Sequence, residues 1–417
     1  MEISKNDEDK KLIKDKFFVK ISFLIFGIGD LLPWNAILSQ LDFFSLYLKK
    51  SFRPSLYFPF LNFFLNILFQ FYLLYKPKIA TYKIQLLICF IVVAISLIIL
   101  PISVYLLSDF EILNIIITAI MILIQGLLNA ICQSALFGLV SFFPLEMIIS
   151  LSAGQAYAGI LTNIIALIIK FFFDKVSHQI EALIYFSIST IFIIICFIFI
   201  ILVYKNDYFK SQLTLSGEFN NPTQNNDNIY EKTKEELLNN KNINETSFMD
   251  LTKLLLSANI LITILCTTTM TLYPNSFTLF DSLSNLLKSY QIITILLIYN
   301  IFDTIGRYSA NCLPQNKLSI YIITLSRLSL IIIIPILHNF KNNESIIFNI
   351  IILICVAFLG ITNGIGSSLI FAFAPTLVSD ELKGKAGNSI SFYLIIGIFL
   401  GTCFSFLMNF IISKIKG

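Results

Sequence analysis

The chain has 417 residues, of which 57% are hydrophobic and only 13% are charged. Soluble domains usually carry about 25% charged residues, so this composition excludes an ordinary soluble protein and predicts a membrane protein. The net charge of +4 gives no sign of nucleic-acid binding, and the seven cysteines show no C-x-x-C spacing. The two histidines, His178 and His338, begin no H-E-x-x-H motif, so we expect neither a metal site nor a cofactor.

Eleven stretches are apolar enough to cross a bilayer, for which about twenty apolar residues suffice. In chain order they are 17–46, 56–75, 84–107, 112–143, 148–173, 181–204, 250–273, 287–311, 318–338, 346–375 and 386–412. The sequence therefore predicts an all-α polytopic membrane protein. The first sixteen residues mix Lys, Asp and Glu and are expected to form a solvated tail.

The longest polar segment, 205–249, lies between the sixth and seventh spans and is rich in Asn, Lys and Glu. Such a composition buries too little apolar surface to fold alone, so we expect a disordered linker. It divides the chain into a six-helix half at 1–204 and a five-helix half at 250–417. Most Lys and Arg residues lie on one side if the N-terminus is cytoplasmic, which also places the linker inside and the C-terminus outside.

Polar and small residues mark several spans as unusual. Gln125, Asn129 and Gln133 recur every four residues and share one helix face. This stripe can serve interhelical packing or line a cavity; Gln133 is the best candidate for the cavity. Gly154 and Gly159 allow close helix contact, and Pro33 can bend the first span. Glycine and proline interruptions in both halves indicate a transport pathway.

An acid and a base, Asp303 and Arg307, lie four residues apart within the eighth apolar stretch. On a helix they share one face, one turn apart. A charge at the bilayer centre costs about 2.5–3.5 kcal/mol on insertion scales, so such residues usually face protein or water and mark functional sites. The alternative is an ion pair that only fixes helix packing.

Four separated segments resemble the equilibrative nucleoside transporter family. They are L-L-P-W-N at 31–35; the stretch from Asn129 through Q-S-A-L-F-G at 133–138 to G-Q-A-Y-A-G at 154–159; N-I-F-D-T-I-G-R at 300–307; and 358–364 with the closing span at 387–406. Their order and spacing cover essentially the whole chain. Ser134, Tyr157 and Asn129 depart from the family's usual residues, which concerns substrate selectivity more than the fold.

The resemblance implies a pseudo-symmetric, major-facilitator-like fold of six and five helices around a central polar cavity. It implies a transporter of nucleosides or nucleobases, purines foremost, working by facilitated diffusion with alternating access, and not an enzyme. The expected substrate-binding residues are Trp34, Gln133, Asp303, Arg307, Leu31, Asn35 and Asn129. The expected packing or gating residues are Pro33, Gly154, Gly159, Arg327 and Asn363. A monomer in the plasma membrane is expected.

The residue chemistry agrees with such a cargo. Trp34 offers a rigid aromatic face for stacking, with an interfacial anchor as the alternative. Gln133 has both an amide donor and an acceptor, suited to a base edge. Asp303 can accept hydrogen bonds from ribose hydroxyls, and Arg307 donates in a fixed fork. Two other hypotheses stay open: a carrier of sugars or amino acids on the same architecture, possibly proton-coupled, and a membrane-integral enzyme or receptor.

Overall fold

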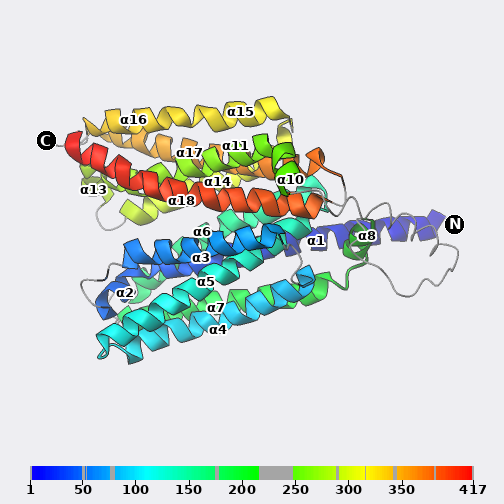
Figure 1. The fold of residues 1–417 in the computed structure, drawn as a ribbon, viewed down its shortest axis with the longest axis horizontal. Helices are drawn as coiled ribbons and strands as arrows, with labels where there is room; N and C mark the ends of the chain where they lie inside the picture. The colour runs from blue at the N-terminus through cyan, green and yellow to red at the C-terminus, as the bar shows by residue number, and fades with distance from the viewer. Residues whose placement is uncertain are drawn as a thin grey trace.

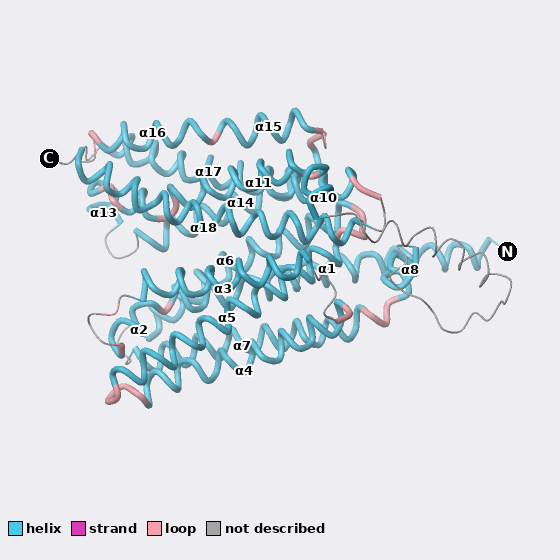
Figure 2. Tube along the Cα trace, in the orientation of Figure 1, coloured by secondary structure: helices cyan, strands magenta, loops and turns pink. Residues whose placement is uncertain are grey.

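The computed structural model describes residues 2–48, 52, 54–75, 80–173, 178–215, 248–287, 291–314, 316–340, 345–379 and 382–415. These residues form helices joined by short connections, with no strand among them. Figure 2 shows the helices running along the long axis, with most of the loops gathered towards the two ends. The all-α prediction is confirmed.

The helices of the N-terminal half lie together in the lower part of Figure 1. They are α1 (Glu2–Ser39), α2 (Leu41–Tyr47), α3 (Pro54–Tyr75), α4 (Tyr82–Leu106), α5 (Glu111–Val140), α6 (Leu145–Phe173), α7 (His178–Val203) and the short α8 (Asp207–Leu215).

The helices of the C-terminal half form the upper group in Figure 1. They are α10 (Phe248–Leu254), α11 (Leu256–Leu272), α12 (Asn275–Thr278), α13 (Asp281–Leu287), α14 (Gln291–Ser309), α15 (Lys317–Ser326), α16 (Leu328–His338), α17 (Ile346–Phe373) and α18 (Lys383–Ile415). The 3-10 turns η2 (Ala310–Cys312) and η3 (Ala374–Leu377) follow α14 and α17.

Outward faces of the helices are apolar, as a lipid environment requires. On α4 the exposed side chains include Ile91, Ile95, Ile98 and Ile102, which recur at helical spacing on one face. The opposite face, with Phe90, Val93 and Leu97 among others, is buried in the bundle. Burial of polar groups inside and exposure of isoleucine outside is the arrangement expected of a protein that spans a membrane.

Ten helical segments among the described residues are long and apolar enough to cross a membrane. Helix α14, which lies in the predicted eighth span, is not one of them. Its 19 residues include Asn300, Asp303 and Arg307, which lower its mean hydropathy. The count of eleven crossing helices therefore stays a prediction, although α14 packs within the bundle against α17 and α6.

The structure adds three details to the predicted elements. Residues 2–16, expected as a solvated tail, are helical and continue into the first span, because Lys and Glu are good helix formers. Residues 207–215 of the expected linker form α8, whereas 216–247 lie outside the described residues. The ninth span is two helices, α15 and α16, that meet at Arg327.

The two groups of helices meet along a broad contact. Helix α6 packs against α14 and α17, and α18 packs against α5 and α3. At one point Phe137 of α5 stacks on Phe371 of α17, with ring centroids 3.8 Å apart and planes 13° from parallel. The contact between α6 and α14 brings the charged pair of α14 against the N-terminal half.

Candidate functional site

Asp303 and Arg307 form a buried ion pair on α14. Arg307 Nε donates to Asp303 Oδ2 at 2.8 Å, across one helical turn. Only 2% of Asp303 and 7% of Arg307 is exposed. The predicted placement on one helix face is therefore observed, and both charges are taken out of solvent and lipid together.

Two glycines of α17 let its backbone approach this turn of α14. A Cβ at Gly360 would lie 2.6 Å from the Tyr299 carbonyl oxygen, and one at Gly364 would collide with the Asp303 carbonyl oxygen. Gly306 of α14 in turn faces the Ile361 backbone. The glycines thus set α17 close enough for its Asn363 side chain to reach Asp303.

Asn363 connects the pair to Arg327. Its Nδ2 donates to Asp303 Oδ1 at 2.7 Å, and its Oδ1 accepts from Arg327 Nη1 at 3.3 Å. Arg327 is fully buried at the junction of α15 and α16, and its Nη2 also donates to Thr269 Oγ1 of α11. Among the described residues no carboxylate pairs directly with Arg327, so its link to an acid runs through Asn363.

On its other side Arg307 reaches the N-terminal half. Its Nη1 donates to Ser152 Oγ and, at 3.5 Å, to Gln155 Oε1, both on α6. Gln155 Nε2 then donates to Asp30 Oδ2 of α1 at 2.8 Å. Ser152 also lies 3.4 Å from the hydroxyl of Ser368 on α17.

These contacts form one chain of hydrogen bonds, which we call the charge chain. In order it comprises Asp30, Gln155, Arg307, Asp303, Asn363 and Arg327. Each of the two side-chain amides presents its NH₂ to a carboxylate and its oxygen to a guanidinium. With two acids and two bases, the charge chain is neutral overall when all four groups are ionised.

Asp30 was not predicted as a site residue, and Gln155 was given no role of its own. The signal for Asp30 was present, because it is an acid within an apolar span, the same feature that singled out Asp303. Nothing in the sequence showed that residues 125 positions apart would join these helices. Arg327 and Asn363, predicted for packing or gating, both belong to the charge chain.

Gln133 lies in a second polar contact between the halves. Its Oε1 accepts from Gln70 Nε2 of α3 at 3.0 Å, and Gln70 Oε1 accepts from Ser391 Oγ of α18 at 3.4 Å. Asn129, one turn away, is buried and its Oδ1 has no partner among the described residues. Gln125 faces α4 instead, since it accepts from Ser96 Oγ at 3.2 Å, which agrees with the packing interpretation for that position.

A stripe of buried polar residues on α3 was not predicted either. Asn62, Asn66 and Gln70 recur every four residues and all are buried, as are Asn129 and Gln133 on the neighbouring helix α5. The amide atoms of Asn62 and Asn66 have no hydrogen-bond partner among the described residues. Buried amides without hydrogen-bond partners are energetically costly, which marks this part of the α3–α5 contact as unusual.

The first-span motif packs mainly inside the N-terminal half. Trp34 is 9% exposed, and its ring meets Phe63 of α3 edge-on, with centroids 5.4 Å apart. Pro33 lies inside α1, which continues to Ser39. Leu31 and Asn35 are partly buried.

Gly154 and Gly159 occupy tight helix contacts, as their spacing predicted. A Cβ at Gly154 would collide with the Leu24 carbonyl oxygen of α1, and one at Gly159 would lie 2.6 Å from the Asn300 side chain of α14. Gly159 therefore allows α6 to approach α14 one turn from Asp303.

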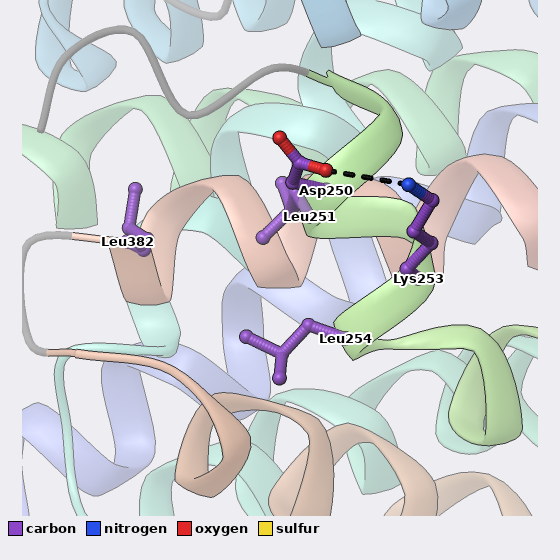
Figure 3. A pocket seen from close by; sticks show the side chains of 5 residues that line it. All are labelled: Asp250, Leu251, Lys253, Leu254 and Leu382. Carbon is purple, nitrogen blue, oxygen red and sulfur yellow. Dashed lines mark ion pairs between the residues drawn. The ribbon is translucent and has the colours of Figure 1, made fainter.

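The pocket drawn in Figure 3 includes no residue of the charge chain. It lies at α10 and the start of α18 and is lined by Asp250, Leu251, Lys253, Leu254 and Leu382. Its one ion pair, Lys253 to Asp250 at 3.5 Å, joins two exposed side chains, so we assign it no role. Among the described residues no three His, Cys, Asp or Glu side chains gather as a metal site.

The helical arrangement matches solved transporters. It is similar to the major facilitator superfamily proton:xylose symporter XylE bound to 6-bromo-6-deoxy-D-glucose, with a TM-score of 0.61 and 12% identity over 97% of this chain and 96% of that chain. The human organic anion transporter MFSD10 matches with a TM-score of 0.51 and 11% identity, over 96% and 99%. The chain therefore has a fold similar to that of the major facilitator superfamily.

The family follows from the sequence. The profile described as nucleoside transporter matches residues 119–410, most of the chain, so the protein belongs to the nucleoside transporter family. Equilibrative nucleotide transporter 1 of Arabidopsis thaliana is 24% identical over 410 residues, covering 94% of this chain and 86% of the relative. Equilibrative nucleotide transporter 7 of the same plant is 24% identical over 424 residues, covering 96% and 98%. The resemblance seen in the four motifs is confirmed.

Proposed function

We propose that this integral membrane protein carries nucleosides or nucleobases, purines foremost, by facilitated diffusion through alternating access. The observation that carries the proposal is the Asp303–Arg307 pair, buried where α14 and α17 meet α6 in a member of the nucleoside transporter family. Ionisable groups inside a membrane bundle are expensive, and their retention at the contact of two halves favours a substrate role.

The free hydrogen-bonding capacity of the pair suits a sugar or a base. Arg307 Nη2 has no partner among the described residues, so its two N–H donors are left for a substrate. Each oxygen of Asp303 accepts one hydrogen bond and keeps a lone pair for a ribose hydroxyl or a base N–H. With all four groups ionised the charge chain is balanced, and the site then favours an uncharged guest over a nucleotide with its phosphate charge.

The remaining predicted contacts belong to the same proposal. Gln133 and Asn129 supply amide groups near the α3 stripe, and Asn129 Oδ1 is an unused acceptor. Trp34, flanked by Leu31 and Asn35, supplies an aromatic surface whose ring already packs on Phe63. In this proposal the base stacks on Trp34 while the polar groups of the substrate bind the amides and the charged pair.

We place the N-terminus and α8 in the cytoplasm and the C-terminus outside, in the plasma membrane. The support is the basic-residue bias of the sequence together with Figure 1, where the N-terminus and α8 lie at one end of the long axis and the C-terminus at the other. An odd number of crossings puts the chain ends on opposite sides of the membrane. This proposal therefore requires α14 to cross as well, which raises the number of crossing helices from ten to eleven.

The test is uptake into proteoliposomes that contain the purified protein. Radiolabelled adenosine, uridine, hypoxanthine, AMP, xylose and leucine are compared with protein-free vesicles, with and without an imposed pH gradient. We expect adenosine and hypoxanthine to equilibrate without a gradient. Uptake of xylose or leucine alone would replace the proposal with the second candidate, a carrier of another solute, and accumulation driven only by a pH gradient would refute facilitated diffusion.

A further inference from the structure

We propose that Asp30 is a positioning residue for the substrate site: it fixes the Gln155 amide so that its oxygen faces Arg307 and orients the guanidinium for substrate. The inference rests on the proposed function of Arg307. It concerns a residue outside the four motifs and on the opposite half of the molecule from the Asp303–Arg307 pair.

Asp30 is well placed to fix the Gln155 amide. The carboxylate is only 4% exposed, and its Oδ2 accepts from Gln155 Nε2 at 2.8 Å. A carboxylate accepts hydrogen bonds but donates none when ionised, so it selects the NH₂ end of the amide. The Gln155 oxygen must then point the other way, towards Arg307 Nη1 at 3.5 Å.

Among the described residues, Asp30 makes no other polar interaction as strong as its hydrogen bond with Gln155. Its second oxygen, Oδ1, is buried and has no hydrogen-bond partner among the described residues. A buried carboxylate with an unsatisfied oxygen destabilises the fold, so a role in packing alone does not explain an aspartate at this position.

The close approach of α1 and α6 keeps the two side chains in register. Gly27 of α1 and Gly154 of α6 face each other, and a Cβ on either would collide with the opposing backbone. Asp30 and Gln155 follow these glycines on the same helices. The close contact therefore fixes the positions of the carboxylate and the amide along the two helix axes. The geometry of Arg307 on α14 is thereby tied to α1, a helix on the other half of the molecule.

Electrostatic balance supports the same assignment. Asp303 neutralises Arg307 directly, whereas Arg327 has only neutral partners among the described residues. When ionised, Asp30 is the fourth charge of the charge chain and makes its sum zero. Neutralising Asp30 would leave an excess positive charge among buried groups and would remove the charge-assisted hydrogen bond that holds Gln155, which is roughly twice as strong as a neutral one.

The test exchanges the carboxylate at position 30 and the amide at position 155. Asp30→Asn, Gln155→Glu and the double variant are assayed in proteoliposomes for the apparent KM of adenosine, with uptake normalised to protein amount. The double variant places an amide NH₂ at position 30 against a carboxylate at position 155, so the hydrogen bond is restored in the reverse sense. Asp207→Asn is the matched control, because Asp207 is an exposed carboxylate that also accepts one hydrogen bond, from Lys11 at 2.9 Å.

We expect Asp30→Asn to raise the apparent KM about tenfold, because the hydrogen bond from Gln155 Nε2 becomes a neutral one and loses its charge assistance, while Vmax per protein changes less. Gln155→Glu alone places two carboxylates in contact and should be worse. The double variant should recover affinity relative to both single variants, and Asp207→Asn should match the wild type.

An unchanged apparent KM in Asp30→Asn would overturn the inference. So would a double variant whose apparent KM is raised by the product of the two single-variant increases, because that would show no restored interaction. Arg307→Gln, measured alongside, separates this failure from that of the proposed function. If Arg307→Gln abolishes uptake and Asp30→Asn does not alter KM, only the positioning role fails. If wild-type protein carries no nucleoside, the proposed function itself fails.

Discussion

Removing one charge of the Asp303–Arg307 pair should harm the protein more than removing both. Asp303 accepts hydrogen bonds from Arg307 Nε at 2.8 Å and from Asn363 Nδ2 at 2.7 Å. In Asp303→Asn, one of these donors must face the new NH₂ group in either orientation of the amide. The variant also leaves Arg307 charged and 93% buried with only neutral partners in contact, since its exposed fraction is 7%.

Stranding one partner of a buried ion pair costs about 3–5 kcal/mol, whereas replacing both is often near neutral. A typical protein is stable by only about 5–15 kcal/mol, so each single variant should show clearly reduced expression and thermal stability. Asp303→Asn combined with Arg307→Gln leaves amides that can hydrogen-bond each other, and Asp30 and Arg327 still balance. The double variant should therefore recover most of the stability.

The assay measures delivered protein and nucleoside uptake on the same cells or vesicles. We expect the double variant to be delivered but to carry nucleoside poorly, because amides lack the charge-assisted hydrogen bonds of the ionised pair. Normal flux through a correctly delivered double variant would refute the substrate role and leave the pair as scaffold. Equal instability of the double and single variants would refute the argument from stranded charge.

Other predictions concern the aromatic surface, the amide contact, the glycines and the topology. Trp34→Ala should weaken substrate affinity and also cost about 3–5 kcal/mol of stability, since the ring is 9% exposed; unchanged KM in delivered protein would exclude it from the site. Gln133→Ala should raise the apparent KM and strand Gln70, a loss of about 1–3 kcal/mol, checked by uptake and thermal melting. Gly364→Ala should cost about 1–3 kcal/mol and reduce uptake, because its Cβ meets the Asp303 backbone. Gly366→Ala is the matched control on the same helix, since its Cβ collides with the flexible end of Leu265 and with no backbone atom, and equal effects would argue against a tight α14–α17 contact. Epitope tags at the two chain ends should be reached by antibody on opposite sides of the membrane; equal exposure of both would exclude an odd number of crossings.

The features that the sequence determined by itself are those that depend on neighbours along the chain. Apolar runs fix where helices can cross a bilayer, because each helix satisfies its own backbone hydrogen bonds. Asp303 and Arg307 are four residues apart, so helix geometry alone brings them together. The glycine spacings likewise predicted close contacts at Gly154 and Gly159, although not which helices would fill them.

The tertiary structure alone decided which polar groups meet across helices. Asp30 and Gln155 are 125 residues apart, and Gln70 and Ser391 are 321 apart, so no local pattern could pair them. The packing of α1 on α6, of α6 on α14 and of α14 on α17 aligns two amides between four ionisable groups and makes the charge chain. Hydrogen bonds act only over about 3 Å, so their partners are set by how the helices pack, which local sequence patterns do not specify.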